Sequence, residues 1–341
     1  MSSQGLGAGG QRRPRKIGTT IAGTAEFISP RREWKPFPEI PAFLITSSCG
    51  ITAHRSRITH TGCPPRPFLF ETGVAYLEIR ELTKHFTKRS GGPFSPRTET
   101  IRAVDGVSLE IEKGEILGLV GESGCGKSTF SRTLMQLTPP TSGSVTLDGE
   151  NLSALPPKEI RRRRLDFQMV FQDPYASLNP RMTVFSTLAE AVRRRHPKLK
   201  GQALYGRIET LMATVGLDPQ AMRKYPHEFS GGQRQRIAIA RALAPEPKLV
   251  IADEPVSALD VSIQSQILNL LKKLQKDLGL TLIFISHDLG VVHYLADRIA
   301  VMYQGKIVES GSAGDVFHQP RNDYTKRLLA AIPKLADTPA A

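Results

Sequence analysis

A glycine-rich stretch, GESGCGKST at residues 121–129, has the composition of a loop that wraps phosphate groups. It fits the pattern G-x-x-x-x-G-K-[ST], in which the glycines let consecutive backbone N–H groups surround the phosphates. In such a loop Lys127 reaches the β- and γ-phosphate oxygens and the hydroxyl of Ser128 ligates Mg²⁺. The nucleotide contacts that we expect come from Gly121, Ser123, Gly124, Cys125, Gly126, Lys127, Ser128 and Thr129.

A second stretch of the chain is also suited to hold a phosphate. In FSGGQRQRIAIARAL, residues 229–243, a serine and two glycines precede a run that lacks Gly and Pro from residue 233 to 244. We expect a helix over 233–243 with Ser230 as its N-cap. Gly231 and Gly232 leave backbone N–H groups open to an anion, with Gln233 beside them. The chain therefore carries two candidate phosphate sites about a hundred residues apart.

Two carboxylates follow a hydrophobic strand in KLVIADEP, residues 248–255. This arrangement presents Asp253 and Glu254 at the carboxyl edge of the predicted sheet, beside the phosphate loop. Asp253 is suited to Mg²⁺, through a water molecule, and Glu254 is suited to polarising the water that attacks a phosphate.

Two more polar residues follow strands at the same predicted edge. Gln172 follows FQMVF and His287 follows LIFIS. Either residue alone would more often be a capping or packing residue, but together they indicate sensors of the γ-phosphate. Gln172 is also a candidate Mg²⁺ ligand, and the expected catalytic set is Lys127, Gln172, Glu254 and His287.

The elements that position these residues form an α/β pattern from residue 76 onward. Strands expected over 115–121, 167–171, 248–252 and 281–286 alternate with helices, which predicts a mostly parallel sheet covered on both faces. The helix after the phosphate loop places Phe130, Leu134 and Leu137 on one side, and a helix over 263–278 presents an apolar face. Alternation in 77–79 and 107–111 predicts half-buried strands, and RIAVMYQGKIVESG predicts a hairpin that turns at Gln304-Gly305.

The chain divides into regions of different composition. Residues 1–73 contain many prolines and no hydrophobic period, so a disordered extension or an over-long translated start is favoured over a functional arm. We expect one domain over 74–333, with a helical insert at about 176–240, and a short tail at 334–341.

Composition limits the class of protein. No apolar run approaches the roughly 18 residues of a membrane span, and the three cysteines lack metal-type spacing, so a reducing cytoplasm is the simplest setting. The net charge is +14, and its sharpest clusters are the arginine runs at 161–164 and 193–195. Neither run is interleaved with aromatic residues that could stack on bases. These runs favour solvated faces, or contacts with a partner or lipid headgroups, and no nucleic acid is expected.

The order of these motifs, with SALD (257–260) after the acidic pair, resembles the nucleotide-binding subunit of an ABC transporter over residues 76–333. The resemblance implies a P-loop NTPase core, an antiparallel β subdomain and a helical insert, with ATP and Mg²⁺ bound and ATP hydrolysed. It implies that Phe86 stacks on adenine. Because a long insert at 87–100 blurs the alignment there, the alternative that Phe86 is an ordinary core or surface residue stays open. Asp260 would contact the nucleotide site. Such subunits pair head to tail, so residues 230–233 would hold the partner's ATP.

Two stretches, FQDPYASLNPRMTV (171–184) and QPRNDYTKRLLAAIP (319–333), are similar to the ATPase subunits of oligopeptide and dipeptide importers, a branch that includes nickel and glutathione systems. Asn322-Asp323 stands where that branch usually has His-Pro. The resemblance implies membrane permease subunits, a second ATPase subunit (identical or paralogous), a separate substrate-binding protein, and a peripheral place on the cytoplasmic face of the membrane. The alternatives are an ATPase-like subunit of a phosphonate-processing complex and a non-transport ABC ATPase.

Overall fold

The computed structural model describes residues 75–90 and 97–332. The chain divides into two compact units, Met1–Pro67 and Phe68–Ala341, and every described residue belongs to the second. The predictions for residues 1–73 and for the tail at 334–341 lie outside the described residues and stay predictions.

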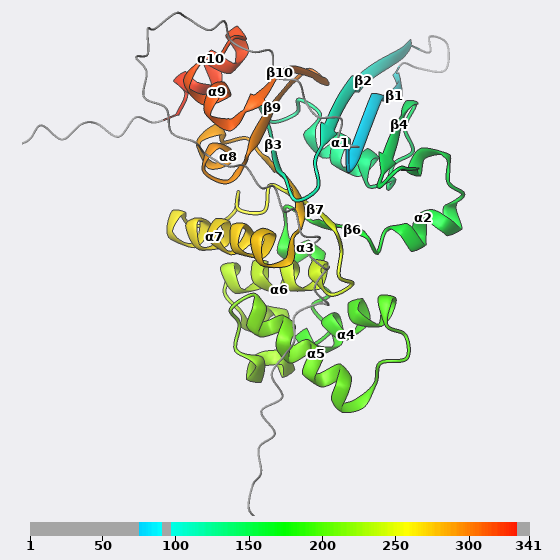
Figure 1. The fold of residues 1–341 in the computed structure, drawn as a ribbon, viewed down its shortest axis with the longest axis vertical. Helices are drawn as coiled ribbons and strands as arrows, with labels where there is room; N and C mark the ends of the chain where they lie inside the picture. Colours follow the sequence, from blue (N-terminus) through cyan, green and yellow to red (C-terminus); the bar gives the residue numbers. More distant parts are fainter. Residues whose placement is uncertain (1–74, 91–96, 333–341) are drawn as a thin grey trace, which may run out of the picture. The chain divides into compact units, whose positions relative to one another are not determined.

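The central sheet of the second unit has six strands in the order β10-β9-β3-β8-β7-β6 (Figure 1). Neighbouring strands from β9 to β6 are parallel, and β10 pairs antiparallel with β9. The prediction of a mostly parallel sheet is confirmed. Its strands are β3 (Ile116–Val120), β6 (Phe167–Val170), β7 (Leu249–Asp253), β8 (Thr281–Ser286), β9 (Arg298–Tyr303) and β10 (Lys306–Ser312).

A second, antiparallel sheet has the order β2-β1-β4-β5, which confirms the predicted antiparallel subdomain. Its strands are β1 (Leu77–Ser90), β2 (Arg97–Ile111), β4 (Ser142–Leu147) and β5 (Glu150–Asn151). Pairing of β1 with β2 continues to the Ser90–Arg97 pair. Residues 87–90 and 97–100 of the insert therefore lengthen these two strands.

Each face of the central sheet belongs to a different hydrophobic cluster. Val250 and Ala252 of β7 pack in a cluster with the helices α4 to α8, whereas Leu249 and Ile251 pack in a cluster with β1, β2, β4 and α1. Successive side chains of a strand point to opposite faces, so the central strands β3, β7 and β8 are buried throughout and lack polar alternation.

Helices surround the central sheet. The helix after the phosphate loop, α1 (Lys127–Leu134), ends earlier than predicted, because Gln136 has a φ of 54°. Leu137 therefore leaves the helix and is 46% exposed, so its prediction as part of the apolar face is wrong. The other helices packed around the strands are α2 (Pro157–Arg163), α7 (Val261–Leu278), α8 (Leu289–Leu295), α9 (Ala313–His318) and α10 (Asp323–Ala330), with a 3₁₀ turn η1 (Leu152–Ala154).

The predicted helical insert is confirmed as helical. Figure 1 shows its main helices grouped together, and α6 contacts α3, α4 and α5. They are α3 (Pro174–Ser177), α4 (Val184–Arg195), α5 (Gly201–Thr214) and α6 (Gly231–Leu243), with the 3₁₀ turns η2 (Pro219–Arg223) and η3 (Pro226–Glu228). The predicted hairpin is confirmed as well, since Gln304 and Gly305 have φ values of 47° and 82° between β9 and β10. No helix in residues 75–90 or 97–332 is both long and apolar enough to cross a membrane.

Candidate active site

The phosphate loop connects β3 to α1, and close packing requires its glycines. A Cβ at Gly121 would lie 2.2 Å from the carbonyl oxygen of Met302, and one at Gly126 would lie 2.0 Å from that of Ala103. Gly126 also has a φ of 114°, a region that strongly favours glycine. Helix α1 begins at this glycine without a side-chain cap, so its first N–H groups are available to an anion.

Lys127 lies inside the loop and is only 4% exposed. Its ammonium group donates to the carbonyl oxygens of Gly121 (2.6 Å) and Glu122 (2.9 Å), and lies 3.7 Å from Oε1 of Glu254. A nucleotide phosphate would exchange with these oxygen partners, because the ammonium group has three rotatable donors.

The four predicted catalytic residues meet at one carboxylate. Besides the Lys127 contact, Oε2 of Glu254 accepts a hydrogen bond from Nε2 of Gln172 at 3.0 Å and lies 3.4 Å from Nδ1 of His287. Glu254 has a φ of 47°, which is uncommon for a residue with a side chain, and its N–H donates to the carbonyl of Ile285 on β8. This backbone turn aims the carboxylate at the phosphate loop, and strain of this kind clusters at active sites.

Asp253 lies beside the start of α1. The hydroxyl of Ser128 donates to Oδ1 at 3.5 Å, and the buried hydroxyl of Ser131 lies 3.3 Å from Oδ2. Burial raises the pKa of Asp253 above its ordinary value, while these two hydrogen bonds favour the ionised form. The hydroxyl of Ser128 and the carboxylate of Asp253 are the hard oxygen donors that Mg²⁺ prefers, so the residues fit this ion. Ser131 was missed, although its position three residues after Ser128 on one helix face is a usable signal.

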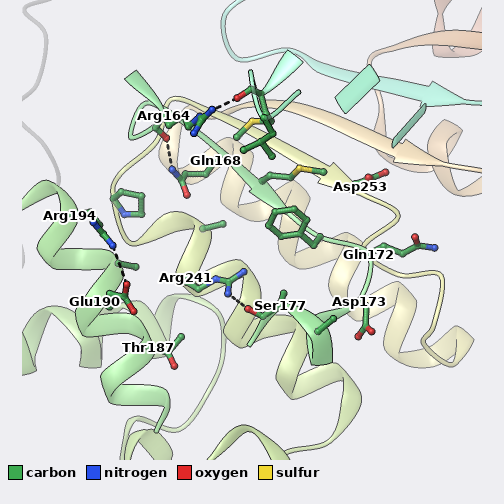
Figure 2. A pocket seen from close by; sticks show the side chains of 18 of the residues that line it. Arg164, Gln168, Gln172, Asp173, Ser177, Thr187, Glu190, Arg194, Arg241 and Asp253 are labelled. Atoms are coloured by element: carbon green, nitrogen blue, oxygen red, sulfur yellow. Dashed lines mark hydrogen bonds and ion pairs between the residues drawn. The ribbon is translucent and has the colours of Figure 1, made fainter. Parts of the chain in front are cut away.

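Gln172 and Asp253 also line a groove of about 870 Å³ that runs toward the helical insert (Figure 2). Its walls come from α1, α3, α4, α6, strand β6 and the segments on either side of that strand. Four arginines contribute to the lining: Arg132, Arg164, Arg194 and Arg241. Figure 2 shows the pair of Arg194 with Glu190 on one side and Arg164 on another. The groove therefore connects the nucleotide site with a surface of the insert.

Helix α3, which begins two residues after Gln172, is attached to α6 by two arginines. The guanidinium group of Arg234 lies 3.9 Å from the ring centre of Tyr175, and Arg241 donates to the carbonyl oxygen of Ser177. The segment that carries Gln172 and the helix of the second phosphate stretch are therefore joined.

The second phosphate stretch forms the start of α6, two residues earlier than predicted. Ser230 is the N-cap, its hydroxyl accepts from the N–H of Gln233, and the Gln233 side chain accepts from the N–H of Ser230. A Cβ at Gly232 would lie 2.5 Å from Cγ2 of Ile263, so this glycine lets α6 approach α7 closely. Ser230 and Gln233 remain exposed.

The two phosphate stretches do not meet within the described part of the chain. No hydrogen bond or ion pair there joins residues 230–233 to residues 121–129, and Figure 1 shows α6 apart from α1. A nucleotide held by the first loop would therefore leave the second stretch free for another molecule.

Two further predicted contacts lie apart from this cluster. Phe86 is on β1, 42% exposed, with Nζ of Lys84 5.2 Å from its ring centre. Asp260 is exposed at the N-cap position of α7, where its side chain makes no capping hydrogen bond. Both are accessible to a ligand, and their roles in adenine stacking and at the nucleotide site stay predictions.

Comparison with known proteins identifies the class. The family model described as "ABC transporter" matches residues 104–257. The oligopeptide transport ATP-binding protein OppF of Salmonella typhimurium is 54% identical over 266 residues, which cover 78% of this chain and 80% of that protein. The chain belongs to the ABC transporter family, as an ATP-binding subunit that hydrolyses ATP.

Other similar proteins agree with this assignment. OppF of Bacillus subtilis is 52% identical over 262 residues, covering 75% of this chain and 82% of that protein. A dimeric post-hydrolysis state of an ATP-binding cassette bound to ADP and Pi is 30% identical with a TM-score of 0.61, covering 70% of this chain and 98% of that one.

Proposed function

We propose that this ATPase drives the import of oligopeptides through separate membrane subunits. The oligopeptide substrate is supported by the several similar proteins named oligopeptide transport ATP-binding proteins, at about half identity. These names favour an importer over a phosphonate-processing subunit or a non-transport ATPase. The observation that carries the chemistry is the convergence of Lys127, Gln172 and His287 on the carboxylate of Glu254.

The residues of this chain have separate tasks in hydrolysis. Lys127 exchanges its carbonyl partners for phosphate oxygens, and the loop N–H groups bind the rest of the phosphate chain. Glu254 accepts the proton of the attacking water, while Gln172 and His287 orient that water and the γ-phosphate. Ser128 and Asp253, with Gln172 beside them, would hold Mg²⁺, which neutralises charge on the phosphates.

Two subunits would complete each site. Ser230 and Gln233 are exposed, and no hydrogen bond among the described residues joins 230–233 to the loop of their own chain. We therefore assign residues 230–233 to the ATP of a second ATPase subunit, identical or paralogous. The dimeric state of the similar cassette supports this pairing. The start of α6 would then supply N–H groups to the partner's γ-phosphate.

The groove beside Gln172 is the surface that we assign to the permease subunits. The groove is lined both by Asp253 of the nucleotide site and by Arg194 of the insert. A permease segment bound in the groove would therefore move when the nucleotide site closes. We place the protein at the cytoplasmic face of the membrane, with a separate binding protein selecting the peptide.

Uptake by whole cells tests this function. Removal of the gene should abolish uptake of a labelled tripeptide, and the wild-type chain should restore it while Glu254→Gln should not. Cross-linking in the same cells should attach the chain to membrane subunits. Normal tripeptide uptake after removal, together with lost uptake of Ni²⁺ or glutathione, would assign a different cargo to the same machinery.

A further inference from the structure

The C-terminal segment of the described chain reaches the phosphate loop. Tyr324, in the first turn of α10, is only 4% exposed, and its hydroxyl oxygen accepts a hydrogen bond from the N–H of Glu122 at 3.0 Å. Its ring lies 4.2 Å, centre to centre, from that of Tyr303 on β9. A residue 202 positions away in sequence therefore contacts the second residue of the loop.

This contact acts on the part of the loop that also holds Lys127. The carbonyl oxygens of Gly121 and Glu122 accept hydrogen bonds from the Lys127 ammonium group. When a phosphate draws Lys127 away, those bonds are lost. The bond from the Glu122 N–H to Tyr324 does not depend on Lys127, so it can hold the loop in both states.

Helix α10 is itself firmly attached to the sheet. The carboxylate of Glu309 on β10 accepts the N–H groups of Arg321 (2.8 Å) and Asn322 (3.1 Å). Burial disfavours the charged form of Glu309, but these hydrogen bonds outweigh it and lower its pKa. Asn322, one of the two residues that depart from the branch pattern, caps α10 by accepting the N–H of Tyr324 at 2.8 Å. Tyr324 is therefore placed by β10.

The same helix lines the catalytic cleft. A cleft of about 710 Å³ is bounded by Glu254 and His287 on one side and by Leu328, Ala331 and Ile332 at the end of α10 on another. Helix α10 and the two residues after it are thus part of the wall of the cleft that contains Glu254 and His287.

We propose that Tyr324 is a positioning residue that fixes the phosphate loop for ATP, and that α10 belongs to the ATPase site. The inference rests on the assignment of residues 121–129 as the nucleotide loop. The Glu122 N–H is part-buried in this contact. Losing the partner of a shielded donor is unfavourable, so without the hydroxyl the loop shifts to another arrangement and ATP binding must reverse that shift.

The test removes one oxygen atom from the full-length protein. Tyr324→Phe keeps the ring contact with Tyr303 and deletes the acceptor for Glu122. We expect KM for MgATP to rise about fivefold with kcat within about twofold of wild type, which corresponds to about 1 kcal/mol. The matched control is Tyr303→Phe, whose hydroxyl contacts the side chain of Gln304 and not the loop. It should leave KM unchanged.

A second variant tests the route through α10. Glu309→Gln removes the charge that holds the start of the helix, so it should raise KM alone and add little in combination with Tyr324→Phe. An unchanged KM in Tyr324→Phe, or an equal change of KM in Tyr303→Phe, would overturn the proposal. A lower melting temperature of Tyr324→Phe with an unchanged KM would also overturn it, because the hydroxyl would then serve stability alone. Lys127→Ala serves as the reference. If it bound ATP normally, the nucleotide loop itself would be wrongly assigned.

Discussion

Glu254→Gln should separate ATP binding from ATP hydrolysis. The substitution keeps the size of the side chain and an acceptor for Gln172, but it removes the negative charge and the ability to take a proton. Loss of a general base typically lowers the rate by about 10²- to 10⁴-fold. We therefore expect turnover at saturating MgATP to fall by about three orders of magnitude.

The same substitution should tighten ATP binding. Oε1 of Glu254 lies 3.7 Å from Nζ of Lys127, and both groups are largely buried. Opposite charges at this distance interact by about 4 kcal/mol at an effective dielectric constant of 20, although desolvation offsets most of this. A phosphate must compete with that carboxylate for Lys127, so its removal should lower the Kd for ATP by about fivefold, or about 1 kcal/mol.

The assay pairs steady-state phosphate release with equilibrium binding of MgATP on the same preparation. Glu246→Gln is a matched control, because Glu246 also has a positive φ of 56° and contacts a histidine and an arginine, His196 and Arg207, away from the site. It should keep both values within about twofold. Turnover near the wild-type rate in Glu254→Gln, or weaker ATP binding, would refute the reasoning.

Three further predictions follow from the same structure. Lys127→Ala and Ser230→Arg, each made in a Glu254→Gln background, should each fail to trap nucleotide, but a mixture of the two proteins should partly regain trapping, because one intact composite site can form between them. If the two proteins pair and the mixture still traps no nucleotide, a site shared between subunits is excluded. Gly232→Ala forces a Cβ to 2.5 Å from Ile263, so we expect the free energy of unfolding, measured in urea, to fall by about 1–3 kcal/mol. The control Gly206→Ala, whose Cβ would meet nothing within 4 Å, should not destabilise the protein, and equal stabilities of the two variants would contradict the close packing of α6 on α7. A chain that starts at Val74 should keep its melting temperature and ATPase rate, because residues 1–73 have no hydrophobic period that would pack in a core. A melting temperature lower by more than a few degrees would show that the preceding segment packs on the ATPase unit.

The sequence predicted the fold and the central chemistry because both depend on local pattern. The acids and polar residues that follow β6, β7 and β8 meet because the carboxyl ends of parallel strands share one edge. The hairpin at Gln304-Gly305 was predictable because its turn residues are themselves a local signal.

What escaped prediction depends on contacts between distant parts of the chain, or on single backbone angles. The pairing of Tyr324 with Glu122 joins two segments that no period or spacing relates. The spacing of apolar residues predicts Leu137 on the helix face, because no sequence signal near it indicates the positive φ of Gln136 that ends the helix. The sequence predicted that Gln172 and His287 share a sheet edge with Glu254. Their direct contacts with its carboxylate depend in addition on the unusual φ of Glu254, which the sequence does not show.

The attachment of α3 to α6 has a thermodynamic consequence for a dimer of the proposed kind. Gln172 would respond to the ATP of its own subunit, and the start of α6, which Arg234 and Arg241 join to α3, would contact the ATP of the partner. Occupancy of one site would then change the affinity of the other, and linkage requires the effect to be reciprocal. Binding curves should depart from a simple hyperbola, and Tyr175→Ala, which removes the Arg234 contact between α3 and α6, should bring the Hill coefficient closer to one.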